Sequence, residues 1–346
     1  MRLALSLGSL TARSRIADTL TYAREADQLG YDTLWVSEKY GSDAPSLLGW
    51  LAAHTRRIAL GSAVMQVPAR SAAMTAMTAA TIDLLSDGRC VLGLGASTLQ
   101  ISEGWHGTRF DQPLAGLREY VDIVRAVLSR RPVDYDGALH QVPLRGSDSR
   151  PMMLDLRNFR PDIPVYLAGV GPRSLRTAGE IADGWIALFL AADLAAEQVA
   201  TVAAGRERRG ATMAGFDVTA GVNAVVGEDV TACVDRLRPY YATFIGGMGS
   251  TKRNYYHDHV ARMGYPEEAR EVRRLFLEGS PAARRAVPES LIDRTSLIGP
   301  FERIVDRMRA YAAAGVTTLS VGLTPRSVED GVQTLRVLAK AAEAAR

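Results

Sequence analysis

Leu3-Ala4-Leu5-Ser6-Leu7 begins the strand–helix–strand unit that decides the fold class, and the unit continues through Ile16–Leu29 and Thr33-Leu34-Trp35-Val36-Ser37. The two short stretches are rich in apolar and β-branched residues, which predicts strands. Apolar residues in Ile16–Leu29 recur at helical spacing, and the following Gly30 predicts the end of an amphipathic helix. A helix that joins two strands in this way is typical of parallel strand pairing.

The alternation of strand and helix runs to the end of the chain. Further strands are predicted at Ile58–Val64, Cys90–Leu94, Val165–Ala168, Trp185–Leu188, Val218–Val226 and Thr317–Val321. Further helices are predicted at Leu47–His54, Met74–Leu85, Pro172–Ile181, Leu194–Arg209, Phe301–Ala314 and Val328–Ala345. Eight strands in 346 residues, with no linker between them, favour a (β/α)8 TIM barrel over an open sheet. We therefore predict an α/β fold in which residues 1–346 form a single domain.

Two long connections interrupt the regular spacing. The first, at about residues 97–160, follows strand four and contains a predicted helix, Leu114–Arg130, and a predicted hairpin, Tyr135–Pro143. The second, at about residues 227–297, follows strand seven and contains the helical run Pro266–Gly279. Long connections in compact domains are often lids or binding loops. Both leave the C-terminal end of a strand, where TIM barrels hold their active sites, so we expect them to cover the site.

Composition excludes several classes of function. Lys and Arg exceed Asp and Glu only by 41 to 38, too small a surplus to predict nucleic-acid binding. Cys90 and Cys233 lack the neighbouring Cys or His of a metal cluster, and two lone thiols fit a reducing compartment. The apolar stretch at the N-terminus is too short for a signal peptide, and no run approaches the ~20 residues of a membrane span. We expect a cytoplasmic protein that binds no metal, nucleic acid or membrane.

Glycines follow predicted strands four and five. Gly93-Leu94-Gly95-Ala96-Ser97 ends the fourth strand, and Ala168-Gly169-Val170-Gly171-Pro172 ends the fifth and leads into a helix. Small residues let a flat ring or a phosphate approach the backbone closely, and a helix N-terminus offers free N–H groups to phosphate. The alternative is that both stretches are tight turns without a ligand. Neither matches the dinucleotide-binding fingerprint, because the third glycine is missing after Gly171.

Strand two leads into side chains suited to proton transfer. Glu38, Lys39 and Tyr40 follow it directly, and a carboxylate or phenol at this strand end can act as a general acid or base. The alternative is that Glu38 and Lys39 form a solvated pair and that Asp43 caps the next helix.

A histidine marks the loop predicted after strand four, Glu103-Gly104-Trp105-His106-Gly107. His106 beside an aromatic residue on a glycine-containing loop can donate a proton to a substrate beneath it, although a lone loop histidine is often simply exposed. The chain has no Gly-x-Ser-x-Gly elbow for a catalytic serine.

Several stretches together resemble the luciferase-like monooxygenase superfamily, and the resemblance covers essentially the whole chain. It narrows, through the motifs after strand four, to the F420-dependent branch that is common in actinobacteria. The stretches that carry it are Gly30–Val36 with Glu38, Ile58–Val64 with Pro68-Ala69-Arg70, Ala80–Arg89, Leu92–Ser97, Glu103–Gly107, Ile181–Trp185, Asn254-Tyr255-Tyr256 and Thr295–Pro300.

This resemblance implies a cofactor site for coenzyme F420, with FMN as the alternative. In F420-dependent relatives a non-prolyl cis peptide supports the back of the deazaflavin, and the matching bond is Ala63–Val64. Gly95, Ala96 and Ser97 match the residues that line its ring. The loop Gly169-Val170-Gly171-Pro172 matches the loop near its phosphate arm.

The resemblance also implies hydride transfer between F420 and a small organic substrate, and we expect reduction of an imine or a conjugated C=C bond. Relatives that act on sugar phosphates or alcohols have a histidine after the acidic residue of strand two. Lys39 replaces it here, which puts those activities in doubt and moves the predicted proton transfer to Glu38, Tyr40 or His106.

Other functions remain open at this point. An FMN-dependent monooxygenase on the same barrel is the main alternative, and a non-catalytic relative is another. An aldolase-type barrel would need a lysine within a strand, and none of the predicted strands contains one. Family resemblance favours a homodimer.

Overall fold

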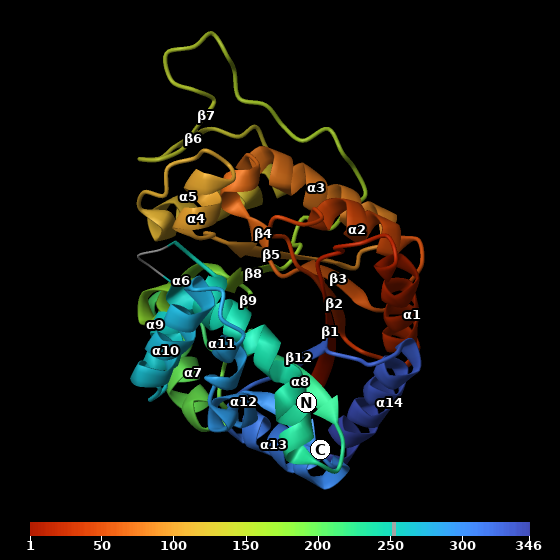
Figure 1. Ribbon diagram of the computed structural model, residues 1–346. Helices are drawn as coiled ribbons and strands as arrows, with labels where there is room; N and C mark the ends of the chain where they lie inside the picture. Colours follow the sequence, from red (N-terminus) through yellow and green to blue (C-terminus); the bar gives the residue numbers. More distant parts are fainter. Residues whose placement is uncertain (251–253) are drawn as a thin grey trace.

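The computed structural model describes residues 1–250 and 254–346, and in it eight parallel strands close into a barrel surrounded by helices (Figure 1). The cyclic order is β1-β2-β3-β5-β8-β9-β10-β12, and the ring closes where Arg2 of β1 lies opposite Thr318 of β12. The predicted TIM barrel is confirmed. Its strands are β1 (Arg2–Gly8), β2 (Thr33–Val36), β3 (Ala59–Ser62), β5 (Cys90–Gly95), β8 (Val165–Ala168), β9 (Gly184–Leu188), β10 (Asp217–Val226) and β12 (Thr318–Leu323).

Helices cover the outside of the barrel, close to the predicted positions. Asp43 caps α2, because its carboxylate accepts a hydrogen bond of 2.8 Å from the Ser46 N–H group, as expected for a residue at that position. The outer helices are α1 (Arg15–Gln28), α2 (Ala44–Ala52), α3 (Ala72–Leu85), α5 (Pro113–Leu128), α6 (Pro172–Ile181), α7 (Ala192–Arg208), α13 (Phe301–Ala313) and α14 (Val328–Ala344).

The run Ile58–Val64, predicted as one strand, is divided. β3 ends at Ser62, the Ala63–Val64 peptide bond is cis as the resemblance implied, and the chain continues as β4 (Met65–Gln66). β4 pairs with β5 further along than β3 does. A short strand, β11 (Ser296–Gly299), was not predicted; it pairs with the C-terminal half of β10.

A polar network closes the N-terminal end of the barrel. The Asp217 carboxylate accepts hydrogen bonds from the hydroxyls of Tyr166 (2.9 Å) and Thr318 (2.8 Å) and pairs with Arg2 at 2.7 Å. The Trp35 ring packs against Tyr166 with centroids 5.5 Å apart. These large side chains fill the N-terminal end of the barrel, so the C-terminal mouth is the end where a ligand can approach.

The first insertion lies at one end of the molecule. It contains α4 (Leu99–Gly104), then α5, and then the predicted hairpin, which is confirmed as β6 (Tyr135–Asp136) paired with β7 (Gln141–Val142). The hairpin and the loop after it project away from the barrel (Figure 1). The sequence placed Glu103 and Gly104 in a loop, but both belong to the last turn of α4.

The second insertion is helical and has a hydrophobic cluster of its own, separate from the barrel core. Its helices gather on the side of the barrel where β9 lies (Figure 1). They are α8 (Val230–Ala242), a π-helical turn (Thr243–Gly247), α9 (Tyr255–Arg262), α10 (Pro266–Leu277), α11 (Ala282–Arg285) and α12 (Glu289–Arg294). Among the described residues, no helix has the length and apolar character needed to cross a membrane.

Candidate active site

Small residues face the interior at the C-terminal ends of the barrel strands. A Cβ atom added to Gly95 would lie 2.6 Å from Cγ2 of Val64 and 4.0 Å from the Cβ of Ala168. A Cβ atom on Gly322 would lie 2.7 Å from Oδ1 of Asn223. A side chain at Gly95 would collide with Val64, and one at Gly322 would have to displace the amide of Asn223. We call these small residues at the ends of the strands, Gly95 and its neighbours, the mouth floor; small residues let a flat ring approach the backbone.

Ser97 directly follows this floor and has an unusual environment. Its φ angle is +69°, which places a non-glycine residue in the left-handed region. The hydroxyl is buried, and no described residue forms a hydrogen bond with it. Since buried polar groups are normally hydrogen-bonded, this hydroxyl is suited to a ligand. The predicted ring-lining residues Gly95, Ala96 and Ser97 thus lie together at the end of β5.

The predicted phosphate loop lies at the end of β8 and begins α6. Gly171 is the N-cap of α6 and Pro172 is its first residue. The side chain of Ser174 folds back, accepting from the Gly171 N–H group at 3.1 Å and donating to the Gly171 carbonyl at 2.8 Å. A Cβ atom on Gly169 would lie 2.7 Å from that hydroxyl, so the loop needs glycine there. The loop therefore holds its backbone close to a helix N-terminus, which suits an anionic group.

Glu38 lies beside this floor but is committed to other groups. Its two carboxylate oxygens each accept a hydrogen bond of 2.8 Å from the Arg70 guanidinium, and backbone N–H groups of Ala44 and Gln66 donate to them as well. Burial alone would raise the pKa of Glu38, but the Arg70 guanidinium and the two N–H groups outweigh it and lower that pKa. The carboxylate therefore stays ionised. The alternative interpretation, that Glu38 and Lys39 form a solvated pair, is wrong, because Glu38 is buried and pairs with Arg70. This environment is better suited to positioning than to donating a proton.

Gln66 connects this pair to His106. The Gln66 Nε2 group donates to the backbone carbonyls of Glu38 (2.8 Å) and Lys39 (3.0 Å), which orients its Oε1 atom toward Nε2 of His106 at 2.8 Å. Because an amide oxygen can only accept, Nε2 of His106 carries the proton. In the neutral ring Nδ1 is then unprotonated and is the nitrogen that can take up a proton. His106 is half-buried, and so differs from a simply exposed loop histidine.

Lys39 and Tyr40 face the second insertion. The Lys39 ammonium lies 4.4 Å from the centroid of the Phe244 ring, and burial lowers the pKa of Lys39. Tyr40 is 58% exposed and borders a hollow of about 360 Å³. The hollow lies between the ends of β2 and β5 and the π-helical turn, so it opens at the barrel mouth. Its lining residues are Tyr40, Gln100, Ile101, Gly104, Trp105, Gly247, Met248 and Gly249.

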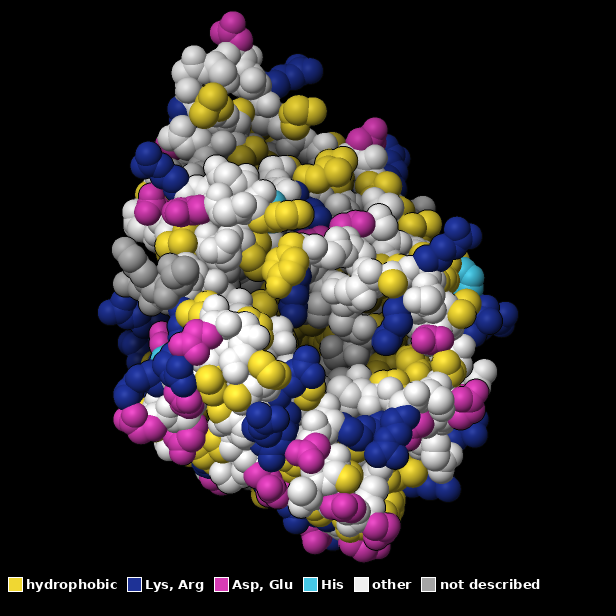
Figure 2. Space-filling view, in the orientation of Figure 1, with side chains coloured by type: hydrophobic (Ala, Val, Ile, Leu, Met, Phe, Trp, Pro, Cys, Tyr) yellow, Lys and Arg dark blue, Asp and Glu magenta, His cyan; other side chains and the backbone are white. Residues whose placement is uncertain are grey.

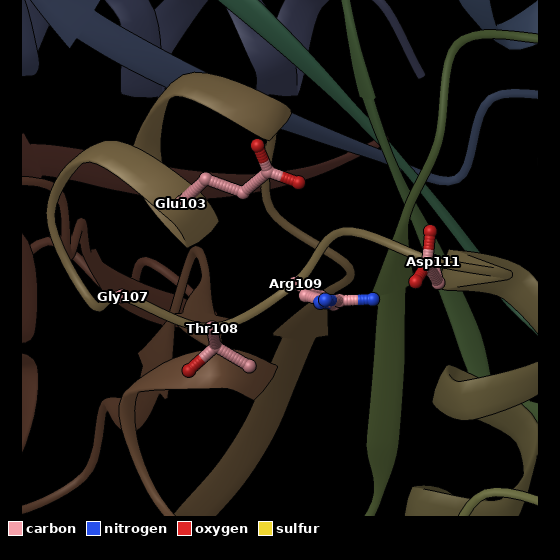
Figure 3. Close-up of a pocket in the computed structure, with 5 residues that line it drawn as sticks. All are labelled: Glu103, Gly107, Thr108, Arg109 and Asp111. Atoms are coloured by element: carbon pink, nitrogen blue, oxygen red, sulfur yellow. The ribbon is translucent and has the colours of Figure 1, made fainter.

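A second hollow, of about 450 Å³, is strongly polar (Figure 3). Glu103 of α4, Arg109 and Asp111 surround it together with Gly107 and Thr108. None of these residues belongs to the predicted cofactor site, and the charged side chains are exposed. This hollow is therefore a feature of the surface of the first insertion, outside the mouth floor.

Comparison with known proteins now adds to this geometry. Residues 3–318 match the family model described as luciferase-like monooxygenase. The chain belongs to this family. A Mycobacterium tuberculosis protein named as a coenzyme F420-dependent oxidoreductase is 36% identical over 331 residues, covering 93% of this chain and 94% of the relative. The 5,10-methylenetetrahydromethanopterin reductase of Archaeoglobus fulgidus is 29% identical over 311 residues, covering 87% and 88% of the two chains.

The luciferase-like fold is also seen in a solved structure. The coenzyme F420-dependent tetrahydromethanopterin reductase of Methanopyrus kandleri superposes with a TM-score of 0.79 at 22% identity, covering 98% of this chain and 97% of that one. The predicted membership of the luciferase-like superfamily and of its F420-dependent branch is confirmed.

Several residues of the mouth cannot be identified from the sequence. Arg70 contributes to the family resemblance, but its pairing with Glu38 across 32 positions has no local signal in the sequence. Gln66, Asn223 and Phe244 were not singled out. Their contacts join residues that are far apart in the chain, so they depend on how the strands and insertions pack together.

Proposed function

We propose that this luciferase-like enzyme is an F420-dependent oxidoreductase that transfers a hydride between the deazaflavin and a small organic substrate. The observation that carries the proposal is the mouth floor of Gly95 and its neighbours, beside the buried hydroxyl of Ser97. Relatives named for F420 dependence, one of them 36% identical over nearly the whole chain, support the choice of cofactor.

The residues present fit this cofactor. A Cβ atom on Gly95 would collide with Val64 and one on Gly169 with Ser174, so glycine keeps the backbone closely packed at the two places to which we assign the ring and the phosphate. Ser97 offers a buried hydroxyl with no hydrogen bond to a described residue. We therefore assign Ala63, Val64, Gly95, Ala96 and Ser97 to the ring. Residues 169–172, at the start of α6, are assigned to the phosphate arm.

F420 supplies a two-electron hydride donor or acceptor when bound. The chain orients substrate and cofactor and excludes water, with the second insertion as its lid. His106 holds or releases a proton at Nδ1 and is the proton-transfer residue that we favour, ahead of Tyr40 and Glu38. The substrate that we propose is one with an imine or a conjugated C=C bond.

Titration of the purified protein with F420 and, separately, with FMN tests the cofactor. We expect the fluorescence of F420 to change at low micromolar concentration, with weak or absent FMN binding. Gly95→Ala should weaken F420 binding, whereas Gly49→Ala on α2, where a Cβ atom meets only one atom at 3.9 Å, should not. Tight binding of FMN alone would replace the proposal with oxygen-dependent flavin chemistry, and binding of neither would favour a non-catalytic protein.

We also propose a homodimer, which rests on an exposed stripe of α3. Met74, Met77 and Leu84 are 52%, 46% and 37% exposed, and with Thr81 they follow the alternating three- and four-residue spacing of a helix that packs against another helix. α3 packs against α5, and α5 leads into the hairpin and the following loop that project from the barrel, here called the projecting segment. That segment also exposes Leu144, Met152 and Met153, and Figure 2 shows hydrophobic side chains on it.

A further inference from the structure

Lys39 is a half-buried cation that forms no ion pair with a carboxylate of the described residues. Among the described residues, no ion pair within 4.0 Å includes the Lys39 ammonium group. The ammonium lies over the face of the Phe244 ring, 4.4 Å from its centroid. Removing an ammonium group from water is unfavourable, and an aromatic ring compensates only part of that loss. An ammonium has three N–H donors, so the contact with one ring leaves donors for a further partner.

The acidic neighbour of Lys39 in sequence cannot supply that partner. Both oxygens of Glu38 accept hydrogen bonds from Arg70, so the two charges of that pair balance each other. Gln66 is neutral and uses its Nε2 group on backbone carbonyls. Neither Glu38 nor Gln66 therefore supplies a free negative charge to the Lys39 ammonium.

The segments that hold Lys39 also form the walls of the 360 Å³ hollow. Tyr40, the next residue, lines it from one side, and Gly247, three residues after Phe244, lines it from the other. Trp105 and Ile101 add an aromatic and an aliphatic surface, and no Lys or Arg belongs to the lining. A hollow of this size, with mostly apolar walls and the Lys39 ammonium on an adjoining segment, is suited to a small molecule with an anionic end.

We propose that Lys39 binds the carboxylate of an aromatic or unsaturated acid whose carbon skeleton lies in the Tyr40–Trp105 hollow. This inference deepens the proposed function by naming its substrate class, and it rests on that function. One ammonium balances the single charge of a carboxylate, whereas a phosphate monoester carries close to two charges and usually meets Arg or several donors. A carboxylate conjugated to a C=C bond also matches the acceptor that we propose for the hydride.

Cinnamate and its neutral amide, cinnamamide, test the proposal because they differ in charge but share a skeleton. Binding to the full chain, with and without F420, is followed by quenching of tryptophan fluorescence, since Trp105 lines the hollow. We expect cinnamate to bind at least tenfold more tightly than cinnamamide. Lys39→Met should remove this preference, Lys39→Arg should keep most of it, and Lys340→Met, on exposed α14, should leave it unchanged.

Equal binding of the two probes by the wild type, or a preference that survives in Lys39→Met, would overturn the proposal. The carboxylates of F420 itself are the other source of the same chemistry. If Lys39→Met weakens F420 binding tenfold, Lys39 serves the cofactor and the substrate assignment is wrong; we expect F420 affinity to change less than twofold. Cinnamate binding that depends on Lys39 in a protein that does not bind F420 would support the subsite and refute the proposed function.

Discussion

Glu38 shows how strongly the surroundings of one side chain decide its role. The sequence predicts it as a candidate for proton transfer, whereas the structure surrounds its carboxylate with the Arg70 guanidinium and two backbone N–H groups. A carboxylate held in this way is stabilised in its charged form. It fixes Arg70 and the start of β4, and through Gln66 it positions the imidazole of His106.

Glu38→Gln should lower the free energy of unfolding by about 3–5 kcal/mol, because it leaves the Arg70 guanidinium partly buried without a counter-charge. Equilibrium urea denaturation measures this loss. Glu278→Gln, at the C-cap of α10, removes an exposed partner of Arg274 and should change stability little. Equal effects of the two variants would contradict the assigned role of Glu38.

The pH dependence of that loss follows from the lowered pKa of Glu38. A carboxyl group whose pKa is lower in the folded protein adds stability above its unfolded pKa, about 4.3, and loses it as the pH falls through the folded value. The difference between wild type and Glu38→Gln should therefore be constant near neutral pH and shrink below about pH 4. Denaturation series at several pH values check this, and a difference that grows on acidification would refute it.

His106 allows a direct test at the level of single atoms. Its neutral ring should carry the proton on Nε2, since Nε2 lies 2.8 Å from the Gln66 Oε1 atom. His54 provides an internal reference with the opposite tautomer, because its Nδ1 lies 2.8 Å from the Trp50 carbonyl oxygen. Nitrogen chemical shifts from NMR distinguish the two forms. In Gln66→Met the His106 ring should populate both tautomers, and an Nδ1-protonated ring in the wild type would contradict the hydrogen bond from His106 Nε2 to Gln66.

At the level of elements, the strands that the sequence predicts well are those with largely apolar runs buried on both faces, such as Cys90–Leu94 and Val218–Val226. The division of Ile58–Val64 into β3 and β4 has no such signal, because it reflects a shift of register against β5, with which both strands pair. α4 is a short helix with polar and apolar residues, and its sequence suits a loop equally well. The π-helical turn is also hard to predict, because it depends on hydrogen bonds from the side chain of Asn254, about ten residues further along the chain.

Asn254 is 2% exposed. Its Nδ2 group donates to the carbonyls of Phe244 and Ile245, at 2.9 and 2.8 Å, and its Oδ1 atom accepts from the N–H groups of Tyr256 and His257. The π-helical turn and the start of α9 are thus tied by one amide. His259 adds a second tie, since its Nε2 donates to the Phe189 carbonyl at 3.2 Å.

Asn254→Ala should therefore loosen the second insertion while the barrel stays folded. Each buried backbone group left without a partner costs about 1–3 kcal/mol, which should speed hydrogen exchange of Thr243–Gly247 and of α9 more than tenfold. Mass spectrometry of exchanged peptides measures this. Ser290→Ala, which removes an exposed hydrogen bond to Tyr265 in the same insertion, is the control. Exchange that accelerates equally in β1 and β12 would show global destabilisation instead.

For the whole molecule, the sequence predicts which residues lie at the site, because the topology of the fold decides that, but it does not predict their contacts. Parallel strands carry Gly95, Ser97 and the Gly169–Pro172 loop to one end of the barrel, so their position there follows from the fold class. The partners of Glu38, Lys39 and His106 come from β4, the π-helical turn and other loops. Their distances depend on how both insertions pack, and no local pattern encodes that. The lid role of these insertions therefore stays a prediction.

The exposed stripe of α3 gives the last prediction, which concerns assembly. A stable protein interface buries about 800 Å² on each partner, and a helix stripe extended by the apolar projecting segment is a surface suited to that. The double variant Met77→Glu, Leu84→Glu places carboxylates in the stripe and should convert a dimer to a monomer with unchanged circular dichroism. Light scattering coupled to gel filtration measures the mass. Leu277→Glu, at a 59% exposed position on α10, should remain dimeric. A wild-type protein that is already monomeric at micromolar concentration would refute the homodimer, and a dimer that survives the double variant would move the interface away from α3.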